Sequence, residues 1–462
     1  MKTKFTLLLL ALCIGFSVSY AQQDEECMNN LSIFDSYAKN KNYDAAYEPW
    51  LIVRKKCPAY SRAIYVRGEK ILEHKIKTST GVDKVAYEVD LLKLYEEYNK
   101  NYGSKFKTGK MYSKKGNLSY KYREELKLTD EELYDIFHKG YTQDLENFTD
   151  PRALYTYFSL EVNKYKKGPK TTNDTQKLFD KYDEIKEIME LQENKNSKTL
   201  NSILQKVEAG TALTKKEKSQ KKFSEGTLKV LGIFMESTDG LVEQFATCEI
   251  LVPLYKEKFE ENKNDSEWLQ RAMNKMGQKD CTDDPLFEQL VAQKNTVQPD
   301  ANTAYYLGLL NEKKGKTAEA DKYYRQAEQL ETDPLKKWKF VFGRAEKAKK
   351  QGSYGKARQL YRQALKLNPS KGTPHLRIAA MYAASANNCG TNALEKRAVY
   401  WLAAQEAQKA GNIDGRLKKA ASQTVANYKA KAPDKSMLFS AGLNSGDSIK
   451  LSCWAASSVR VP

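Results

Sequence analysis

An internal repeat in the C-terminal half constrains this chain more than any other feature. A set of small and aromatic residues recurs 37 residues along the chain, and a proline closes each copy. The first copy carries Gly308, Gly315, Ala320, Tyr324, Ala327 and Pro334, and the second carries Ala345, Gly352, Ala357, Tyr361, Ala364 and Pro369. Small residues let paired helices approach closely, aromatic residues fill the space between pairs, glycine marks the turn and proline ends the second helix. A period of this length predicts stacked helix hairpins.

The composition agrees with an all-α fold. Gly and Pro are sparse, at 24 and 12 of 462 residues, which disfavours the frequent turns that many short strands would need. Charged residues make up 29% of the chain and the mean hydropathy is −0.71, as expected for thin helical layers with much exposed surface. The length allows two or more domains.

The repeat resembles the tetratricopeptide repeat (TPR). Tyr306-Leu-Gly-Leu-Leu and Ala357-Arg-Gln-Leu-Tyr-Arg-Gln-Ala-Leu-Lys-Leu-Asn-Pro369 carry this resemblance best. A third copy starts at Gly372 and is interrupted by Ala386-Asn-Asn-Cys-Gly390 before its second helix. The N-terminal region matches loosely through Ala46, Trp50 and Pro58, although Phe34 replaces the usual small residue. The resemblance implies an α-solenoid that binds a protein partner on its concave face.

A narrower resemblance points to exported TPR proteins of Bacteroidota, most of which have no assigned role. It lies in Lys41-Asn-Tyr-Asp-Ala-Ala-Tyr-Glu-Pro-Trp50 with Cys57-Pro58, and in Gly446-Asp-Ser-Ile-Lys-Leu-Ser-Cys-Trp454. This similarity implies a periplasmic protein, with association with the outer membrane as an option. It supplies no reaction.

The first residues have the pattern of an export signal. Lys2 and Lys4 precede the apolar run from Phe5 to Ile14, and Ser19-Tyr20-Ala21 predicts cleavage before Gln22. The run is too short for an uncleaved membrane anchor. The expected organisation is a signal peptide (1–21), an N-terminal helical domain of degenerate repeats (22–168), a charged helical hairpin (169–228), a TPR domain (229–435) and a β-like tail (436–462).

Two segments interrupt this helical pattern. The basic, glycine-containing stretch from Gly103 to Ser119 is expected to be a mobile loop. The hairpin at 169–228 is expected to fold back between one apolar stretch at Leu178–Met189 and another at Leu200–Val207, and to project from, or bridge, two halves.

The C-terminal tail differs from the rest of the chain. Ser448 to Trp454 alternates in β fashion and is predicted to pair with Ser457 to Val461 as a hairpin. Asp447-Ser448-Ile449 also resembles the Bacteroidota O-glycosylation acceptor, although an ordinary turn is the favoured interpretation.

Six cysteines remain after signal removal, and an even number in an exported protein suggests disulfides. Antiparallel helix geometry pairs Cys27 with Cys57, and Cys248 with Cys281. The remaining pair, Cys389 and Cys453, would link a loop of the third repeat to the tail. The alternative is that some of them stay reduced and buried.

The charge is strongly basic but unevenly distributed. The formal net charge is +18, of which Lys2 and Lys4 belong to the signal. Export makes nucleic acid an unfavourable partner for this basic chain. The remaining candidate partners are acidic lipid headgroups, acidic glycans and an acidic protein face. The segment from Lys336 to Lys366 contains eleven basic residues and a single acidic residue, Glu346. The segment from Glu124 to Asp150 contains nine acidic residues. Solvated helix faces are the alternative interpretation.

Catalytic and metal-binding signals are weak. His74, His138 and His375 are far apart and lie in no ligand spacing, and the chain has no C-x-x-C, G-x-S-x-G or phosphate-loop motif. We therefore expect a protein that is not an enzyme and that needs no cofactor and no metal.

The first helix of each repeat is expected to line a partner-binding groove with an aromatic floor and cationic edges. The twelve residues predicted to line this groove are Asn302, Tyr305, Tyr306, Leu309, Lys339, Phe342, Glu346, Lys349, Lys350, Thr373, Leu376 and Arg377. Such a groove suits an extended or helical protein segment that carries acidic groups. It lacks the polar clamp for a terminal carboxylate, because Tyr305, Leu309 and Phe342 stand at the clamp positions. The aromatic residues are equally compatible with packing against the next repeat alone.

The functional hypothesis is a periplasmic scaffold or adaptor that binds an envelope protein or peptide. The alternative is a binder of an acidic glycan or lipid surface, which would use the basic stretch from Lys336 to Lys366.

Overall fold

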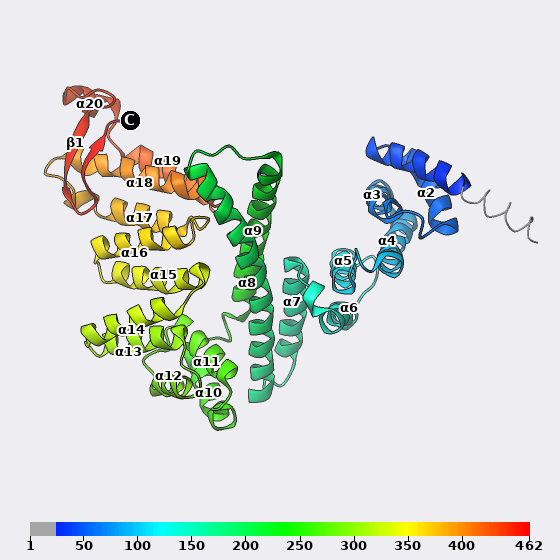
Figure 1. Cartoon of the computed structure of the whole chain (residues 1–462), viewed down its shortest axis with the longest axis horizontal. Helices are drawn as coiled ribbons and strands as arrows, with labels where there is room; N and C mark the ends of the chain where they lie inside the picture. Colours follow the sequence, from blue (N-terminus) through cyan, green and yellow to red (C-terminus); the bar gives the residue numbers. More distant parts are fainter. Residues whose placement is uncertain (1–24) are drawn as a thin grey trace, which may run out of the picture. The chain divides into compact units, whose positions relative to one another are not determined.

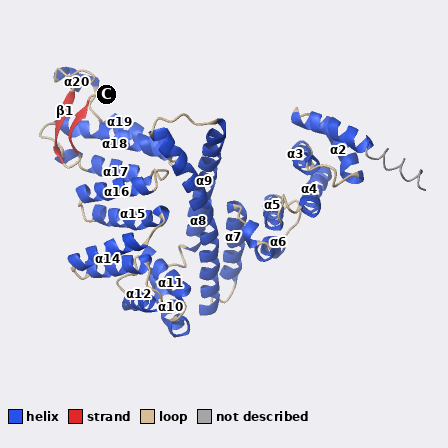
Figure 2. Cartoon of the chain, viewed as in Figure 1, coloured by secondary structure: helices blue, strands red, loops and turns tan. Residues whose placement is uncertain are grey.

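The computed structural model describes residues 25–462 and divides the chain into two compact units, Met1–Pro169 and Lys170–Pro462. The predicted export signal and its cleavage site lie outside the described residues. Helices dominate both units, and the described strands form one short antiparallel pair near the C-terminus (Figure 2). The all-α prediction with a C-terminal β-hairpin is confirmed.

The N-terminal unit is a series of antiparallel helices. After a helix over residues 25–39, its elements are α2 (Tyr43–Lys56), α3 (Ala63–Thr78), α4 (Gly81–Tyr102), α5 (Thr108–Lys121), α6 (Asp130–Gln143), the 3₁₀ turn η1 (Leu145–Asn147) and α7 (Pro151–Lys167). Trp50 is fully buried and donates a hydrogen bond to the Ile64 carbonyl at 2.7 Å. Gly68 makes room for this indole, since a Cβ there would lie 2.6 Å from Trp50 Nε1.

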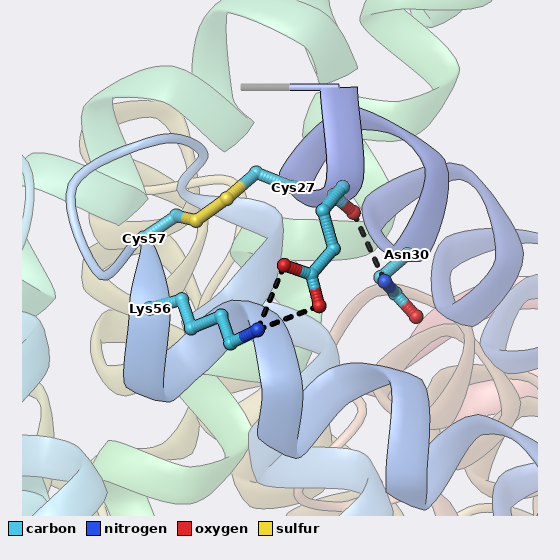
Figure 3. The surroundings of a disulfide bond; sticks show 5 residues. Cys27, Asn30, Lys56 and Cys57 are labelled. Carbon is cyan, nitrogen blue, oxygen red and sulfur yellow. Dashed lines mark hydrogen bonds and ion pairs between the residues drawn. A yellow bond between two sulfur atoms is a disulfide. The ribbon is translucent and has the colours of Figure 1, made fainter. Parts of the chain in front are cut away.

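The disulfide between Cys27 and Cys57 joins the first helix to the end of α2 (Figure 3). The two Cα atoms are 6.3 Å apart, within the usual range for a disulfide. Beside it, the Lys56 ammonium contacts both carboxylate oxygens of Glu26 at 2.7 Å. The structure thus joins these two cysteines as the helix-hairpin argument predicts.

The predicted mobile loop at Gly103–Ser119 is wrong, because most of this segment is helix α5. Two of its three glycines, Gly109 and Gly116, resemble turn signals in the sequence but lie within the helix, against neighbouring elements. A side chain on Gly116 would overlap the ring of Phe137 on α6, and one on Gly109 would overlap the backbone near Asp144. These glycines allow close packing rather than a break in the helix.

The second unit begins with two long helices and continues as a stack of shorter ones (Figure 1). The long helices are α8 (Thr172–Glu208) and α9 (Lys215–Val242). The shorter ones are α10 (Cys248–Asn262), α11 (Ser266–Gln278), α12 (Pro285–Val297), α13 (Ala301–Lys313), α14 (Thr317–Leu330), α15 (Pro334–Lys350), α16 (Tyr354–Leu367), α17 (Thr373–Ala384), α18 (Ala393–Ile413), α19 (Lys418–Lys431) and α20 (Lys435–Ser440), with a 3₁₀ turn η2 (Ala386–Asn388) between α17 and α18.

The two best repeats are the helix hairpins α13–α14 and α15–α16, and their geometry matches the sequence pattern. The ring of Tyr324 lies against Gly308, where a Cβ would be 2.7 Å from the ring. Gly315 and Gly352 both have φ of +73° and form the turns within the two hairpins. The remaining repeat positions, Ala320, Tyr324, Ala327, Ala345, Ala357, Tyr361 and Ala364, are all buried. The prediction that small residues lie between closely packed helices is confirmed.

The long hairpin exists, but its predicted turn is wrong. α8 runs unbroken through both predicted arms, because Asn196 and Ser197, in the polar stretch interpreted as a turn, are buried by packing. The chain turns at Gly210, whose φ is +72°, and Thr214 then caps α9 through a reciprocal capping box with Glu217. The hairpin therefore extends to Val242, past the predicted boundary at 228.

The C-terminal tail packs on the third repeat, α17–α18. Strands β1 (Ser448–Cys453) and β2 (Ala456–Arg460) pair antiparallel, with Ile449 opposite Val459, and both of these side chains are buried. The disulfide between Cys389 and Cys453, with Cα atoms 4.6 Å apart, ties β1 to the loop before α18.

The third predicted disulfide, between Cys248 and Cys281, is also present, with Cα atoms 5.5 Å apart. It joins the start of α10 to the segment that follows α11. Among the helices that the structure describes, none combines the length and the apolarity needed to cross a bilayer.

A buried ionic cluster ties together α16, α17 and α18. Glu406 contacts His375 Nδ1 at 2.6 Å and accepts a hydrogen bond from Arg362 at 2.7 Å. Burial alone would raise the pKa of Glu406, but the hydrogen bonds from His375 and Arg362 outweigh burial and lower that pKa from 4.5 to about 2. A depressed carboxyl pKa contributes stability that is complete above about pH 4.5 and is lost as the pH falls toward 2.

Cys248→Ser should lower the melting temperature, because it opens a covalent loop that contributes at most about 3–4 kcal/mol in the chain-entropy model. Thermal unfolding measures the change. An unchanged melting temperature, together with a reactive Cys281 thiol in the unmodified protein, would contradict this disulfide.

Gly116→Ala should destabilise the N-terminal unit by about 1–3 kcal/mol, because the new methyl group overlaps the Phe137 ring. Gly226→Ala on α9 is the matched control. No atom lies within 4 Å of its Cβ position, so it should stabilise by up to about 1 kcal/mol through helix propensity. Calorimetry of both variants measures whether each substitution lowers or raises the free energy of unfolding. A rise in stability for Gly116→Ala would exclude the close crossing of α5 and α6.

Glu406→Gln should flatten the acid dependence of stability in the C-terminal unit. The depressed pKa contributes at most about 3 kcal/mol, of which wild type loses about 2 kcal/mol between about pH 5 and about pH 3, whereas the variant has no carboxylate to protonate there. Melting temperatures at these two pH values test this, with the exposed Glu260→Gln as control. An equal fall in melting temperature between the two pH values for all three proteins would contradict the role of the cluster.

Candidate partner-binding surface

The first helices of three successive repeats, α13, α15 and α17, carry all twelve residues predicted to line the groove. Contacts between neighbouring helices connect this row. Tyr305 of α13 stacks on Phe340 of α15 with ring centroids 5.1 Å apart, and Arg377 of α17 donates to Glu346 of α15 at 3.1 Å. The three helices thus present one connected strip, which we call the first-helix surface.

The tyrosines of the predicted aromatic floor are used mainly in packing between repeats. Tyr306 is 8% exposed, packs edge-on against Phe287 and lies over Gly277. Tyr305 places its hydroxyl over Gly343, and burial raises its pKa to about 12, so the phenol stays neutral. These rings stabilise the stack rather than line an open floor.

Phe342 is only partly buried. It stacks on Trp338, with centroids 4.8 Å apart, and lies beside Tyr361 at 5.7 Å. Leu376 is also partly buried and packs against the apolar cluster of the third repeat. The apolar part of the first-helix surface that solvent reaches is therefore narrow.

The polar residues of the surface are more accessible. The side chains of Lys339, Lys350 and Arg377 are 53%, 83% and 44% exposed. Glu346 accepts hydrogen bonds from the hydroxyl of Tyr361 and from Arg377. Asn302 donates to Asn274 of α11 at 2.7 Å. Leu309, Lys349 and Thr373 are partly exposed. The accessible surface is mixed polar with cationic edges.

Helix α8 lies along one side of this surface, which the sequence interpretation missed. It runs beside the repeats (Figure 1) and carries an acidic row spaced three and four residues apart. The row consists of Asp183, Glu187, Glu190 and Glu193, which contact Lys275, Arg271, Lys339 and Lys371 respectively, at 2.5–3.1 Å. The spacing places all four carboxylates on one helix face, and it is the signal from which this contact was predictable.

The contact with α8 is in part buried. The Lys275 side chain is 5% exposed and its partner Asp183 is 15% exposed. Burial would raise the pKa of Glu193, but the nearby Lys371 and Arg416 outweigh burial and lower it. Further along α8, Asn201 accepts a hydrogen bond from the Ser370 amide at 3.0 Å. α8 is thus fixed against α11, α15 and the loop before α17.

The basic stretch from Lys336 to Lys366 is less cationic than its composition indicates. Carboxylates from other helices pair with four of its eleven basic residues, namely Lys339, Arg344, Lys347 and Arg362. This internal neutralisation weakens the alternative in which the stretch binds an acidic glycan or lipid surface. Within residues 25–462, no group of three or more His, Cys, Asp or Glu side chains is arranged to hold a metal ion.

No protein-family model matches this chain, and no curated protein matches it. Among solved structures, it is similar to a tetratricopeptide repeat protein from Parabacteroides merdae, at 12% identity over 66% of this chain and 93% of that chain, with a TM-score of 0.25. It is similar to yeast Tom70, at 12% identity over 91% and 90%, with a TM-score of 0.31. It is also similar to the structure of Naa15/Naa10 bound to HypK-THB, at 12% identity over 88% and 78%, with a TM-score of 0.20.

The repeats themselves define the fold. Paired helices with a glycine turn, and with small residues at their crossings, are helix hairpins of the tetratricopeptide type.

Proposed function

We propose that this protein is a non-catalytic scaffold of the cell envelope that binds a protein segment on its first-helix surface. The observation that carries the proposal is the connection of α13, α15 and α17 into one strip by the Tyr305–Phe340 and Glu346–Arg377 contacts. A strip across several repeats suits an extended or helical segment, since each repeat contributes a few contacts along its length.

The charge of the surface suggests what the segment looks like. Lys350 and Arg377 are exposed, and Phe342 and Leu376 on the same two helices are partly exposed. An acidic segment with a few apolar anchors complements this arrangement. The chain's own α8 has the same chemistry, because its acidic row pairs with Lys339 of the surface and with Lys275 and Lys371 beside it.

The compartment is part of the proposal. Three disulfides join cysteines 30, 33 and 64 residues apart. Such bonds persist in oxidising compartments and are rare in the cytosol, so they support an exported, periplasmic protein.

A photoreactive residue placed at Lys349 or Lys350 should crosslink one discrete protein in the native envelope. The matched controls are Gln359 and Lys366, which are exposed on the second helix of the same repeat. Arg377→Glu should reduce the yield from Lys350 by about tenfold, because it repels the acidic segment. Mass spectrometry of the adducts measures both effects.

Three outcomes would contradict the proposal. One is equal crosslinking from the control positions. Another is a yield that Arg377→Glu leaves unchanged. The third is an adduct that disappears near 0.5 M salt, about the level at which exposed charge attraction is screened, which would favour an acidic glycan or lipid surface.

A further inference from the structure

Helix α9 has two seams of regularly spaced residues, and one of them is buried against α8. The buried seam consists of Ser224, Leu228, Leu231, Thr238 and Val242, each at most 8% exposed. This seam accounts for the packing of the hairpin. It leaves the other side of α9 free for a different role.

The second seam faces solvent. Phe223, Val230 and Ile233 are 70%, 42% and 50% exposed. With Gly226 between the first two, they are spaced three and four residues apart, and Ser237 and Gly240 continue this spacing. This is the pattern of one face of a coiled coil. We call this row of residues the exposed seam.

The two glycines of the exposed seam have no role in the packing of the described residues. A Cβ at Gly226 or Gly240 would meet no atom within 4 Å, whereas Gly232 of the same helix lies under the Arg416 side chain. Each exposed glycine costs a helix up to about 1 kcal/mol relative to alanine. A glycine at a seam position lets another backbone come close, which alanine would hinder.

The rim of the exposed seam is cationic. Lys222 and Lys229 are exposed and flank Phe223 and Val230 on one side. The segment 215–229 of α9 holds six lysines, namely Lys215, Lys216, Lys218, Lys221, Lys222 and Lys229. Its two glutamates are already engaged within the hairpin, Glu217 with Lys206 at 2.6 Å and Glu225 with Lys221 at 3.0 Å.

We propose that the exposed seam of α9 docks an acidic amphipathic helix of a partner protein. The apolar face of that helix would cover Phe223, Val230 and Ile233, its backbone would approach Gly226, and its carboxylates would face Lys222 and Lys229. This site is separate from the first-helix surface and does not depend on the proposed function.

Two other occupants fit the seam less well. A helix that lies on a bilayer presents a broad apolar face and gains nothing from glycine, whereas this seam is one residue wide and contains two glycines. Two copies of α9 paired about Phe223–Ile233 would bring lysines against lysines, because Lys222 and Lys229 are the exposed charges beside that stretch.

A designed peptide tests the proposal with the full-length mature chain. The probe has about 28 residues, enough to form a helix alone, with leucine at the seam positions and glutamate on both flanks. Its fluorescein anisotropy at about 0.15 M salt measures binding. A scrambled peptide of the same composition, which cannot form an apolar face, should bind at least about tenfold more weakly.

Variants of the seam make the test specific. Phe223→Ser and Gly226→Ala should each weaken binding of the probe by about tenfold, a loss of about 1.4 kcal/mol. Gly226→Ala should at the same time raise the melting temperature, so its loss of binding cannot come from unfolding. Phe439→Ser, which removes an 87% exposed aromatic side chain elsewhere in the unit, should leave the affinity unchanged.

Each of the following results would overturn the proposal. Equal binding of the scrambled peptide, or equal affinity of Phe223→Ser and Phe439→Ser, would show attraction by charge alone. Phe223-dependent flotation with vesicles that contain phosphatidylglycerol, without binding of the probe, would assign the seam to a membrane. A dimer in sedimentation that Phe223→Ser dissociates would assign it to a second copy.

Discussion

The close approach of helices at small residues is the constraint on which the rest of this structure depends. At Gly308 the ring of Tyr324 occupies the space of a missing side chain, and Gly68 and Gly116 admit Trp50 and Phe137 in the same way. Each aromatic ring therefore locks two helices at a short distance, and the stack propagates from one pair to the next. Without these crossings the first helices would not come close enough for residues such as Glu346 and Arg377 to connect them.

The period of the repeat was sufficient to predict the helix pairs and their turns, and antiparallel hairpin geometry was sufficient to predict two of the disulfides, because each follows from local spacing. The role of a particular glycine was harder to predict. Gly315 and Gly352 adopt positive φ and form turns, whereas Gly109 and Gly116 lie inside a helix and meet a neighbouring element. The sequence pattern is the same in both cases, and only the tertiary neighbour distinguishes them. The misplaced turn of the long hairpin has a related origin, since polar Asn196 and Ser197 are buried there by packing.

The position of the candidate surface could be predicted from the sequence, but the burial of its aromatic residues and its neighbouring helix could not. The helix pattern identified the first-helix residues, and the structure connects them. The pattern did not show that Tyr305 and Tyr306 would be used between repeats, nor that α8 would lie beside them. The long hairpin also carries charge, namely the acidic row of α8 and the cationic rim of α9. It is thus a second charged surface in the unit that holds the first-helix surface. One of its helices is fixed to the repeats, and the other presents an apolar face to solvent.

Helix α8 and the first helices form one packed body that holds the first-helix surface in place. Hydrogen–deuterium exchange of the full chain tests it most directly, since backbone amides exchange with the free energy of the opening that exposes them. The backbone amides of α8 from residue 183 to residue 201 should exchange as slowly as those of α15. Exchange of this α8 segment within seconds, while α15 stays protected, would contradict it.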